Sequence, residues 1–213
     1  MSVKIKIRKT EELTKGELTE AELRRVDPER REKLLRLKYD GARALSYTAG
    51  LLLAEAAKKE LSLEPEEIRI CRGEHEKPFL EGAEGFYYNL SHTEGLCVIA
   101  YGDEPVGADC ERIRFREKDL AVAKRCFTDE EYAYIEAAGD DMHVFSERFF
   151  RIWTIKESYL KYTGEGISVA LDSFCVDPEG MCVRGRTARF TEYVYGDHMI
   201  MICTASGAVD FPT

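Results

Sequence analysis

The sequence has no long apolar run: among its 213 residues, apolar stretches such as Ala49–Ala54 are far shorter than the roughly 20 residues that a membrane crossing needs. It has no excess of basic charge either, because 31 Lys and Arg stand against 40 Asp and Glu. A general nucleic-acid binder needs a net basic surface. Residues Met1–Arg8 contain no apolar signal-peptide core. We therefore expect a cytoplasmic protein that binds neither nucleic acid nor membrane.

Paired cysteine motifs are also missing. The sequence has 7 cysteines, an odd number, and no two of them have CxxC spacing. The nearest pair of metal-like ligands is Cys71 with His75, whereas a structural zinc site needs four ligands. We predict reduced, mostly buried cysteines that act as small apolar side chains.

Helix and strand signals, by contrast, are present along the chain. Helices are expected to begin at the capping box Thr19–Glu22, at Asp27-Pro28 and at Thr128, and to cover Ala42–Leu61 and Glu147–Tyr162. The expected strands are Val3–Ile7, Ile68–Cys71, Leu96–Tyr101, Val106–Cys110, Phe174–Cys175, Met181–Val183, Ala188–Tyr195 and Met199–Thr204. Helices followed by strands in each half indicate an α+β fold of two halves, 1–105 and 106–213.

One segment departs from the overall acidity. Arg24–Lys38 carries seven basic and three acidic residues, so its net charge is +4 and that of the remaining chain is -13. Charge alone leaves two interpretations open: a solvated helix face, or an anion site for phosphates or an acidic partner.

Two acids stand at the end of an apolar strand. Asp109 and Glu111 are two residues apart, so on a strand both side chains project from the same face. They would repel each other unless a cation lay between them, and hard oxygen ligands suit Mg²⁺. An ordinary strand exit carrying two acids is the alternative.

The last predicted helix carries a third candidate acid. Glu157 and Lys161 are four residues apart on one face, with Trp153 one turn earlier. The pair could be a surface ion pair of little energetic consequence. Because it borders an apolar face, Glu157 could instead complete a metal site or act as a general base.

A polar segment, Asn89–Thr93, precedes the strand at Leu96 and is expected to be a loop. Ser91 and His92 could be structural there, or could donate hydrogen bonds to a phosphate. Ser91 has no G-x-S-x-G elbow, which argues against a hydrolase triad.

Taken in order, KPFL (77–80), NLSH (89–92), VGADCE (106–111) and WTIKESYLK (153–161) resemble the 4'-phosphopantetheinyl transferases, and most closely the larger, surfactin-synthetase-activating type. The family's two hallmark blocks, G-(I/V/A)-D-x-E and W-(S/T/C)-x-K-E-(S/A)-x-x-K, are met at 107–111 and 153–161. Cys126-Phe127-Thr128 matches the element between them. The resemblance runs from about Asp27 to Ser173.

This resemblance implies a monomeric pseudo-dimer of two similar α+β halves, with coenzyme A in the cleft between them. The reaction that it implies moves the 4'-phosphopantetheine group of coenzyme A onto a serine of an acyl or peptidyl carrier protein. Adenosine 3',5'-bisphosphate is released. Carrier proteins of this kind are typically acidic, which would give the basic segment a purpose.

The resemblance also implies residue roles. Asp109, Glu111 and Glu157 would hold Mg²⁺ against the pyrophosphate of coenzyme A, and Glu157, or Glu111 through a water, would accept the serine proton. Lys161 would stabilise or protonate the leaving phosphate. The expected coenzyme A contacts are Lys156, Ser91 and His92 to phosphate, Lys77 and Pro78 on the adenine side, and Arg43, with Arg30 and Lys33, to the 3'-phosphate or pyrophosphate.

Two departures from the family pattern stand out. Glu76 occupies a position where relatives often have glycine, and the spacing from Arg30 to Arg43 aligns only with a small gap. Two alternatives stay open: an inactive protein that still binds coenzyme A, and an interaction module that binds an acidic partner through Arg24–Lys38. All three acids and Lys161 are retained, which favours activity.

Overall fold

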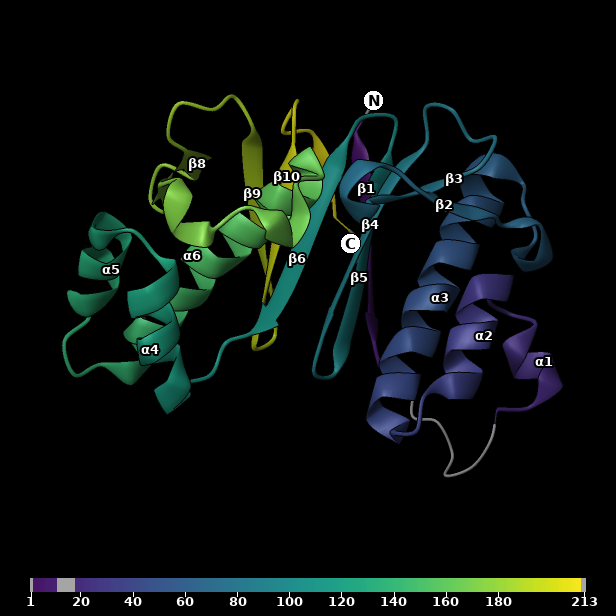
Figure 1. Cartoon of the computed structure of the whole chain (residues 1–213), viewed down its shortest axis with the longest axis horizontal. Helices are drawn as coiled ribbons and strands as arrows, with labels where there is room; N and C mark the ends of the chain where they lie inside the picture. The colour runs from purple at the N-terminus through teal and green to yellow at the C-terminus, as the bar shows by residue number, and fades with distance from the viewer. Residues whose placement is uncertain (1, 11–17, 212–213) are drawn as a thin grey trace.

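The computed structural model describes residues 2–10 and 18–211. Its main elements lie in four layers (Figure 1): a long helix, two sheets and a second long helix. Helix α3 (Asp40–Leu61) covers the sheet with strand order β11-β1-β5-β4, and α6 (Met142–Thr163) covers the sheet β6-β10-β9. The expectation of an α+β fold is confirmed.

The other elements complete these layers. The strands are β1 Val3–Lys9, β2 Ile70–Arg72, β3 Pro78–Leu80, β4 Tyr87–Thr93, β5 Leu96–Gly102, β6 Val106–Arg112, β7 Val176–Asp177, β8 Cys182–Val183, β9 Arg189–Tyr195, β10 His198–Thr204 and β11 Val209–Asp210. The remaining helices are α1 Glu20–Leu23, α2 Pro28–Arg36, α4 Glu117–Cys126 and α5 Asp129–Glu136, with short 3-10 turns at Pro65–Glu67, Glu74–Glu76, Gly166–Ser168 and Leu171–Ser173.

Helix starts follow the capping signals in the sequence. The hydroxyl of each capping threonine, Thr19 or Thr128, accepts a hydrogen bond from the backbone N–H of the third helical residue. That residue is a glutamate in both helices, and its carboxylate accepts a hydrogen bond from the backbone N–H of the threonine. Asp27 caps α2, with Pro28 in its first turn, as expected. Helix α6 begins earlier than expected because Asp141 caps it, and it ends at Gly164, whose φ is 80°.

The interior is built by strand alternation. Leu96, Val98 and Ala100 of β5 pack against β6 and β10 between the two sheets, whereas the intervening residues of β5 face α3. Strand β6 alternates in the same way. Its apolar residues face the layer between the sheets, so Asp109 and Glu111 project from the opposite face.

Gly107 allows α6 to lie directly on β6. A Cβ atom at Gly107 would lie 2.0 Å from the carbonyl oxygen of Ser158 and 2.4 Å from the backbone nitrogen of Tyr162. No side chain fits there. The close approach brings the face of α6 that carries Glu157 and Lys161 to the strand that carries Asp109.

Two expectations about strands were wrong. Residues Asn89–Thr93 form most of β4 and not a loop, because Tyr88 and Leu90 pack toward α3 while Asn89, Ser91 and Thr93 alternate onto the other face. The expected strand at Phe174–Cys175 lies instead at Val176–Asp177. Strand β11 pairs in parallel with β1, so the last strand of the second half joins the sheet of the first.

All seven cysteines are unpaired. The expectation that most of them are buried was wrong, because only Cys97, Cys110 and Cys203 are buried and the other four are half-buried. In the described part of the chain, no helix has the length and apolar character that a membrane crossing requires.

Candidate active site

Asp109 forms the centre of the candidate site. Its Oδ1 accepts hydrogen bonds from Lys161 Nζ at 2.6 Å and from Ser91 Oγ at 3.0 Å. Its Oδ2 is buried and has no hydrogen-bond partner among the described residues. A buried carboxylate oxygen without a partner is costly, so this atom is available to a ligand.

The other two predicted acids lie within electrostatic reach of Asp109. Burial and the charge of Asp109 together raise the pKa of Glu111 to about 7. The same two causes raise the pKa of Glu157. Although burial opposes it, the charge and hydrogen bond of Asp109 raise the pKa of Lys161. The charge of Asp109 disfavours the charged forms of both glutamates, so the site favours a bound cation.

Basic groups of the N-terminal half interact electrostatically with His92, which Asp109 and Lys161 also influence. Burial, and then the charges of Lys161, Lys33 and Arg30, lower the pKa of His92. Burial, followed by the charge of Arg30, also lowers the pKa of Lys33. These four cationic or titratable groups thus share one electrostatic environment, which would favour a phosphorylated ligand.

The expectation that Lys156 binds phosphate was wrong. Its side chain is completely buried, and its Nζ lies 2.8 Å from Glu131 Oε1. It also donates to the carbonyl oxygens of Leu171 and Phe174, at 2.6 Å each. Lys156 therefore ties α6 to α5 and to the segment after α6, and its ammonium has no access to a ligand.

A cavity of about 550 Å³ is lined by both halves. Lys77, Pro78 and the start of β4 line it from the N-terminal half, and Tyr162–Gly164 at the end of α6 line it from the other. Since β4 and α6 also carry Ser91, His92, Glu157 and Lys161, the same two elements connect the cavity to the acids. Lys77 Nζ donates to Tyr162 O at 2.7 Å, so its amine already bridges the halves.

Glu76 points to solvent. Its side chain is 84% exposed and lies 3.5 Å from Arg72. Its φ is 65°, a left-handed conformation that glycine adopts without strain. This backbone geometry gives a physical reason for the glycine that relatives often have here.

The hydroxyl of Ser91 has several partners. It donates to Asp109, accepts from the backbone nitrogen of Cys110 at 3.1 Å and lies 3.3 Å from Lys161 Nζ. A serine has one proton to donate. The expected phosphate contact therefore stays a prediction, and it requires the hydrogen bond to Asp109 to be given up.

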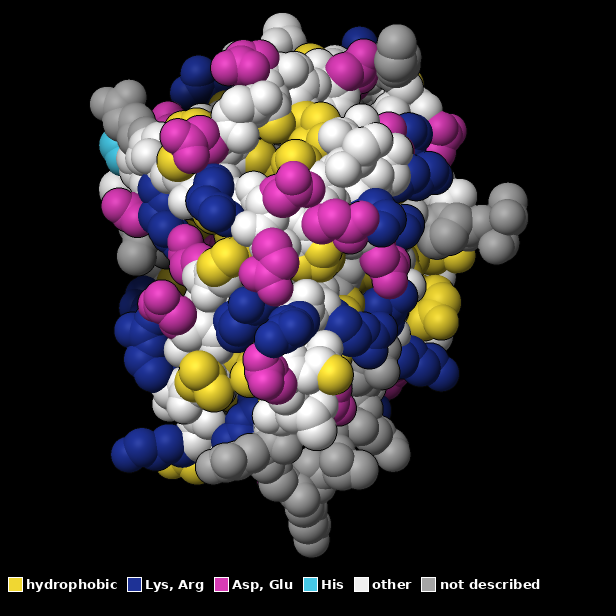
Figure 2. Space-filling model, turned by 90° about the vertical axis from the view of Figure 1, so that its right-hand side faces the viewer, with side chains coloured by type: hydrophobic (Ala, Val, Ile, Leu, Met, Phe, Trp, Pro, Cys, Tyr) yellow, Lys and Arg dark blue, Asp and Glu magenta, His cyan; other side chains and the backbone are white. Residues whose placement is uncertain are grey.

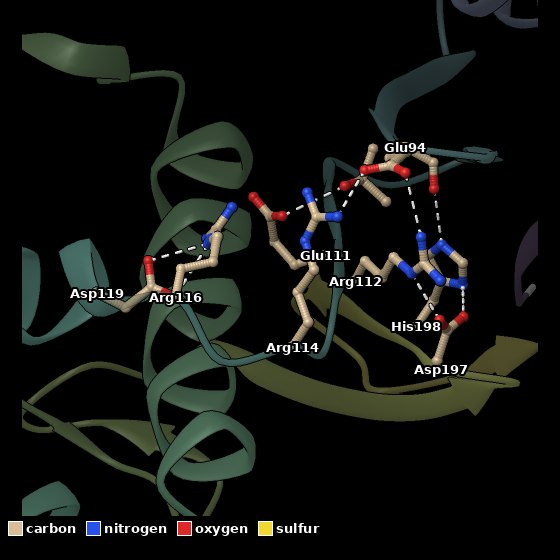
Figure 3. Close-up of polar contacts among 9 residues, drawn as sticks. Glu94, Glu111, Arg112, Arg114, Arg116, Asp119, Asp197 and His198 are labelled. Atoms are coloured by element: carbon tan, nitrogen blue, oxygen red, sulfur yellow. Dashed lines mark hydrogen bonds and ion pairs between the residues drawn. The ribbon is translucent and has the colours of Figure 1, made fainter. Parts of the chain in front are cut away.

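Three arginines after Glu111 were missed by the sequence analysis. Arg112, Arg114 and Arg116 are each two residues apart, a spacing that would place them on one face if the strand continued and could have revealed them, but β6 ends at Arg112. Figure 3 shows Arg114 and Arg116 on either side of Glu111. Arg114 pairs with Glu94 at 2.8 Å and Arg116 with Asp119 at 3.0 Å, and the charge of Arg116 partly offsets the rise in the pKa of Glu111.

The basic segment 24–38 is partly neutralised by its neighbours. Arg24, Arg31 and Arg36 pair with Glu20, Glu66 and Glu32. Figure 2, which views the end of the molecule formed by α1, α2 and α3, shows Lys and Arg side chains interspersed with Asp and Glu. Arg43 pairs with Asp40 at 3.2 Å and donates to Leu37 O, so its contact with coenzyme A stays a prediction.

The donor set fits Mg²⁺ in chemistry. Carboxylate oxygens are the ligands that this ion prefers, and Asp109 Oδ2 is buried without a partner. Within residues 2–10 and 18–211, however, no three His, Cys, Asp or Glu side chains lie close enough together to chelate one ion. The other oxygen of Asp109, Oδ1, already accepts a hydrogen bond from Lys161 Nζ.

Three acids that interact electrostatically with Lys161, one of them also with His92, in a protein of two α+β halves that share a cavity, are an arrangement suited to phosphate chemistry. Two family models match the chain in succession: "4'-phosphopantetheinyl transferase, N-terminal" at residues 14–103 and "4'-phosphopantetheinyl transferase superfamily" at residues 105–198. The chain belongs to the 4'-phosphopantetheinyl transferase superfamily.

Curated relatives agree with this assignment. A 4'-phosphopantetheinyl transferase of Bacillus subtilis is 33% identical over 71% of this chain and 66% of the relative. The 4'-phosphopantetheinyl transferase gsp of Aneurinibacillus migulanus is 34% identical over 62% of this chain and 53% of the relative. HetI of Nostoc sp., also named as such a transferase, is 34% identical over 57% of this chain. The alignments with the first two therefore span 53% to 66% of those relatives' own length.

Proposed function

We propose that this protein transfers the 4'-phosphopantetheine group of coenzyme A to a serine of an acyl or peptidyl carrier protein. The serine oxygen forms a bond to the phosphorus that carries the pantetheine arm. The bond from that phosphorus to adenosine 3',5'-bisphosphate breaks, and the serine proton passes to a protein base. The apo carrier protein becomes the holo form.

One observation carries this proposal: Asp109, whose buried Oδ2 has no partner among the described residues, pairs with Lys161 and lies within electrostatic reach of Glu111 and Glu157. The elements β4 and α6, which carry residues of this site, also line a cavity shared by both halves. The two halves of the protein contribute different groups to the site. The N-terminal half, 1–105, supplies Lys33, His92 and Lys77 to the phosphates and the adenine side. The C-terminal half, 106–213, supplies the acids and Lys161.

Each protein group has a role that suits its charge. Glu157 accepts the serine proton, or Glu111 does so through a water, since both have raised pKa values that favour proton uptake. Lys161 stabilises the leaving phosphate, and its raised pKa keeps it protonated. Asp109, Glu111 and Glu157 would hold Mg²⁺, which would supply positive charge against the pyrophosphate when bound.

The carrier protein brings the serine to this site as an acidic partner. Lys and Arg side chains of the segment 24–38, which follows α1 and includes α2, contribute to its docking, and the transferase acts as a monomer. We place it in the cytoplasm, where its seven unpaired thiols stay reduced. If docking is electrostatic, the affinity for the carrier protein falls as salt rises, and an affinity independent of salt argues against this surface.

Intact-mass spectrometry of an apo carrier protein tests the proposal. After incubation with this protein, coenzyme A and Mg²⁺, the carrier should gain the mass of one phosphopantetheine group. The gain should be absent with a chelator and in Asp109→Ala, whose fold should survive. No gain with fatty-acid, polyketide and peptide carriers alike would refute the activity.

The interaction-module alternative receives no support from the relatives, since all three are named as transferases. Glu157→Gln separates the two functions. It should abolish transfer if the protein is an enzyme, and should leave partner binding unchanged if the basic segment is the functional surface.

A further inference from the structure

Within residues 2–10 and 18–211, no strand pairs with the edge of β6 that faces β4. Each of these two strands lies at the end of its own sheet. In an antiparallel pair, alternate residues direct their backbone N–H and C=O groups to the same side. Because β6 pairs with β10 on one side, its even-numbered residues direct these groups toward β4.

Side chains of the N-terminal half take the place of the missing strand. They come from positions 77, 89, 91 and 93, and they meet β6 in the same order along its length. The contacts are Lys77 Nζ to Val106 O (3.4 Å), Ala108 N to Asn89 Oδ1 (3.0 Å), Cys110 N to Ser91 Oγ (3.1 Å) and Thr93 Oγ1 to Glu111 Oε2 (3.4 Å). We call these four contacts the inter-half ladder.

The two central contacts are buried. Asn89 and Ser91 are 6% and 4% exposed, and Ala108 and Cys110 are buried as well. A buried N–H group without an acceptor is strongly unfavourable, so these two amides depend on side-chain oxygens from the other half. The ladder therefore sets the position of one half relative to the other along β6.

Asp109 lies between the two central contacts. The N–H of Ala108, the residue before it, and the N–H of Cys110, the residue after it, both donate to side chains of β4, so the strand is held on both sides of Asp109. Ser91 and Lys161 then hold its Oδ1. Asn89 makes no hydrogen bond to Asp109, Glu111 or Glu157 among the described contacts. Through Ala108 it nevertheless holds β6, the strand that carries Asp109 and Glu111.

We infer that Asn89 is a positioning residue, which acts through the backbone of β6 to hold Asp109 in the geometry that transfer needs. The kinetic part of this inference rests on the proposed function, whereas the ladder itself is a property of the fold. A displacement of reacting groups by about 1 Å can cost on the order of a hundredfold in rate. Loss of Asn89 should therefore lower kcat more than it weakens coenzyme A binding.

Asn89→Ala is compared with two other variants. Asn89→Asp keeps an acceptor oxygen at the same position and should preserve the hydrogen bond to Ala108 N. Leu90→Ala is the matched control, because Leu90 is the next residue of β4 but packs toward α3. It should lower global stability without changing the ladder.

Hydrogen exchange of individual backbone amides, measured by NMR under native conditions, reads the ladder directly. In Asn89→Ala the Ala108 amide should exchange about tenfold faster or more relative to the slowest amides of the core. In Asn89→Asp and Leu90→Ala this ratio should stay within about twofold of the wild type. Asn89 is the single asparagine in a sequence without glutamine, so its side-chain amide gives one assignable pair of signals.

Kinetics with a carrier protein complete the test. Asn89→Ala should lower kcat by about tenfold or more, with the KM for coenzyme A within about threefold of the wild type. Unchanged exchange at Ala108 in Asn89→Ala would overturn the ladder, and faster exchange with an unchanged kcat would overturn the positioning role. Absence of transfer by the wild type, with Ala108 protected, would refute the proposed function and the kinetic role but not the ladder.

Discussion

Lys161 Nζ lies 2.6 Å from Oδ1 of Asp109, while Oδ2 of the same buried carboxylate has no partner. The two residues come from different elements, α6 and β6, and they meet because Gly107 lets the helix rest on the strand. One oxygen of Asp109 is thus neutralised by the protein, and the other is left for a ligand.

Lys161→Ala is expected to lower kcat by about a hundredfold while the Kd for coenzyme A changes by less than about threefold. The reason is that negative charge on the leaving phosphate develops mainly in the transition state. Single-turnover kinetics and a direct coenzyme A titration measure the two quantities separately. Lys161→Arg, which keeps the positive charge, should retain more activity than the alanine variant. An unchanged kcat in Lys161→Ala would show that the lysine only supports Asp109.

Lys156→Met is expected to destabilise the protein by about 3–5 kcal/mol, because it leaves Glu131 charged and buried without its partner. Chemical denaturation measures the loss. Coenzyme A affinity of the folded fraction should be unchanged, because the ammonium has no access to the cavity. Lys156→Met combined with Glu131→Gln should recover part of the stability. Normal stability with weakened coenzyme A binding would restore the phosphate role for Lys156.

Local sequence rules predicted much of this architecture. The capping boxes at Thr19 and Thr128 and the two-residue spacing of Asp109 and Glu111 depend only on neighbouring residues, and these predictions agree with the structure. The polar segment Asn89–Thr93 was predicted to be a loop. The alternation of its side chains between two faces becomes clear only when the neighbouring sheet is known. A strand whose polar face meets the edge of another sheet resembles a loop in sequence.

Lys156 lies within the motif at 153–161, yet its side chain does not point to the same place as those of Glu157 and Lys161. A helix turns about 100° per residue, so Glu157 and Lys161 lie on one face while Lys156 lies about 140° away from Lys161. Helical geometry alone could therefore have excluded a shared ligand. The ladder contact of Asn89 with Ala108 could not be predicted, because it joins two halves through residues 19 positions apart without a repeating pattern.

Glu76→Gly is expected to stabilise the protein by about 0.5–1 kcal/mol. The φ of 65° strains any residue with a Cβ atom, and part of the relief is lost to the greater freedom of glycine in the unfolded chain. Thermal and chemical denaturation measure the gain. Glu76→Ala removes the charge and the contact with Arg72 but keeps the Cβ atom, so it should give no such gain. Equal stabilisation by both substitutions would mean that charge, and not backbone strain, is responsible.

Lys77 should make stability depend on pH in the alkaline range. Burial lowers the pKa of Lys77 from its ordinary value of 10.5 to about 8. Between these values the unfolded chain binds the proton that the folded protein has lost, so the free energy of unfolding rises with pH, by up to about 3 kcal/mol. The neutral amine still has two N–H groups for the carbonyl oxygens of Tyr162 and Val106, so the bridge between the halves survives deprotonation.

Denaturation at pH 7.5 and pH 10, compared between the wild type and Lys77→Met, isolates this contribution, since the other groups that titrate there are common to both proteins. The wild type should gain stability relative to the variant as pH rises. Parallel pH profiles would mean that Lys77 keeps its ordinary pKa, and therefore that its ammonium is solvated and does not lie across the cleft on the end of α6.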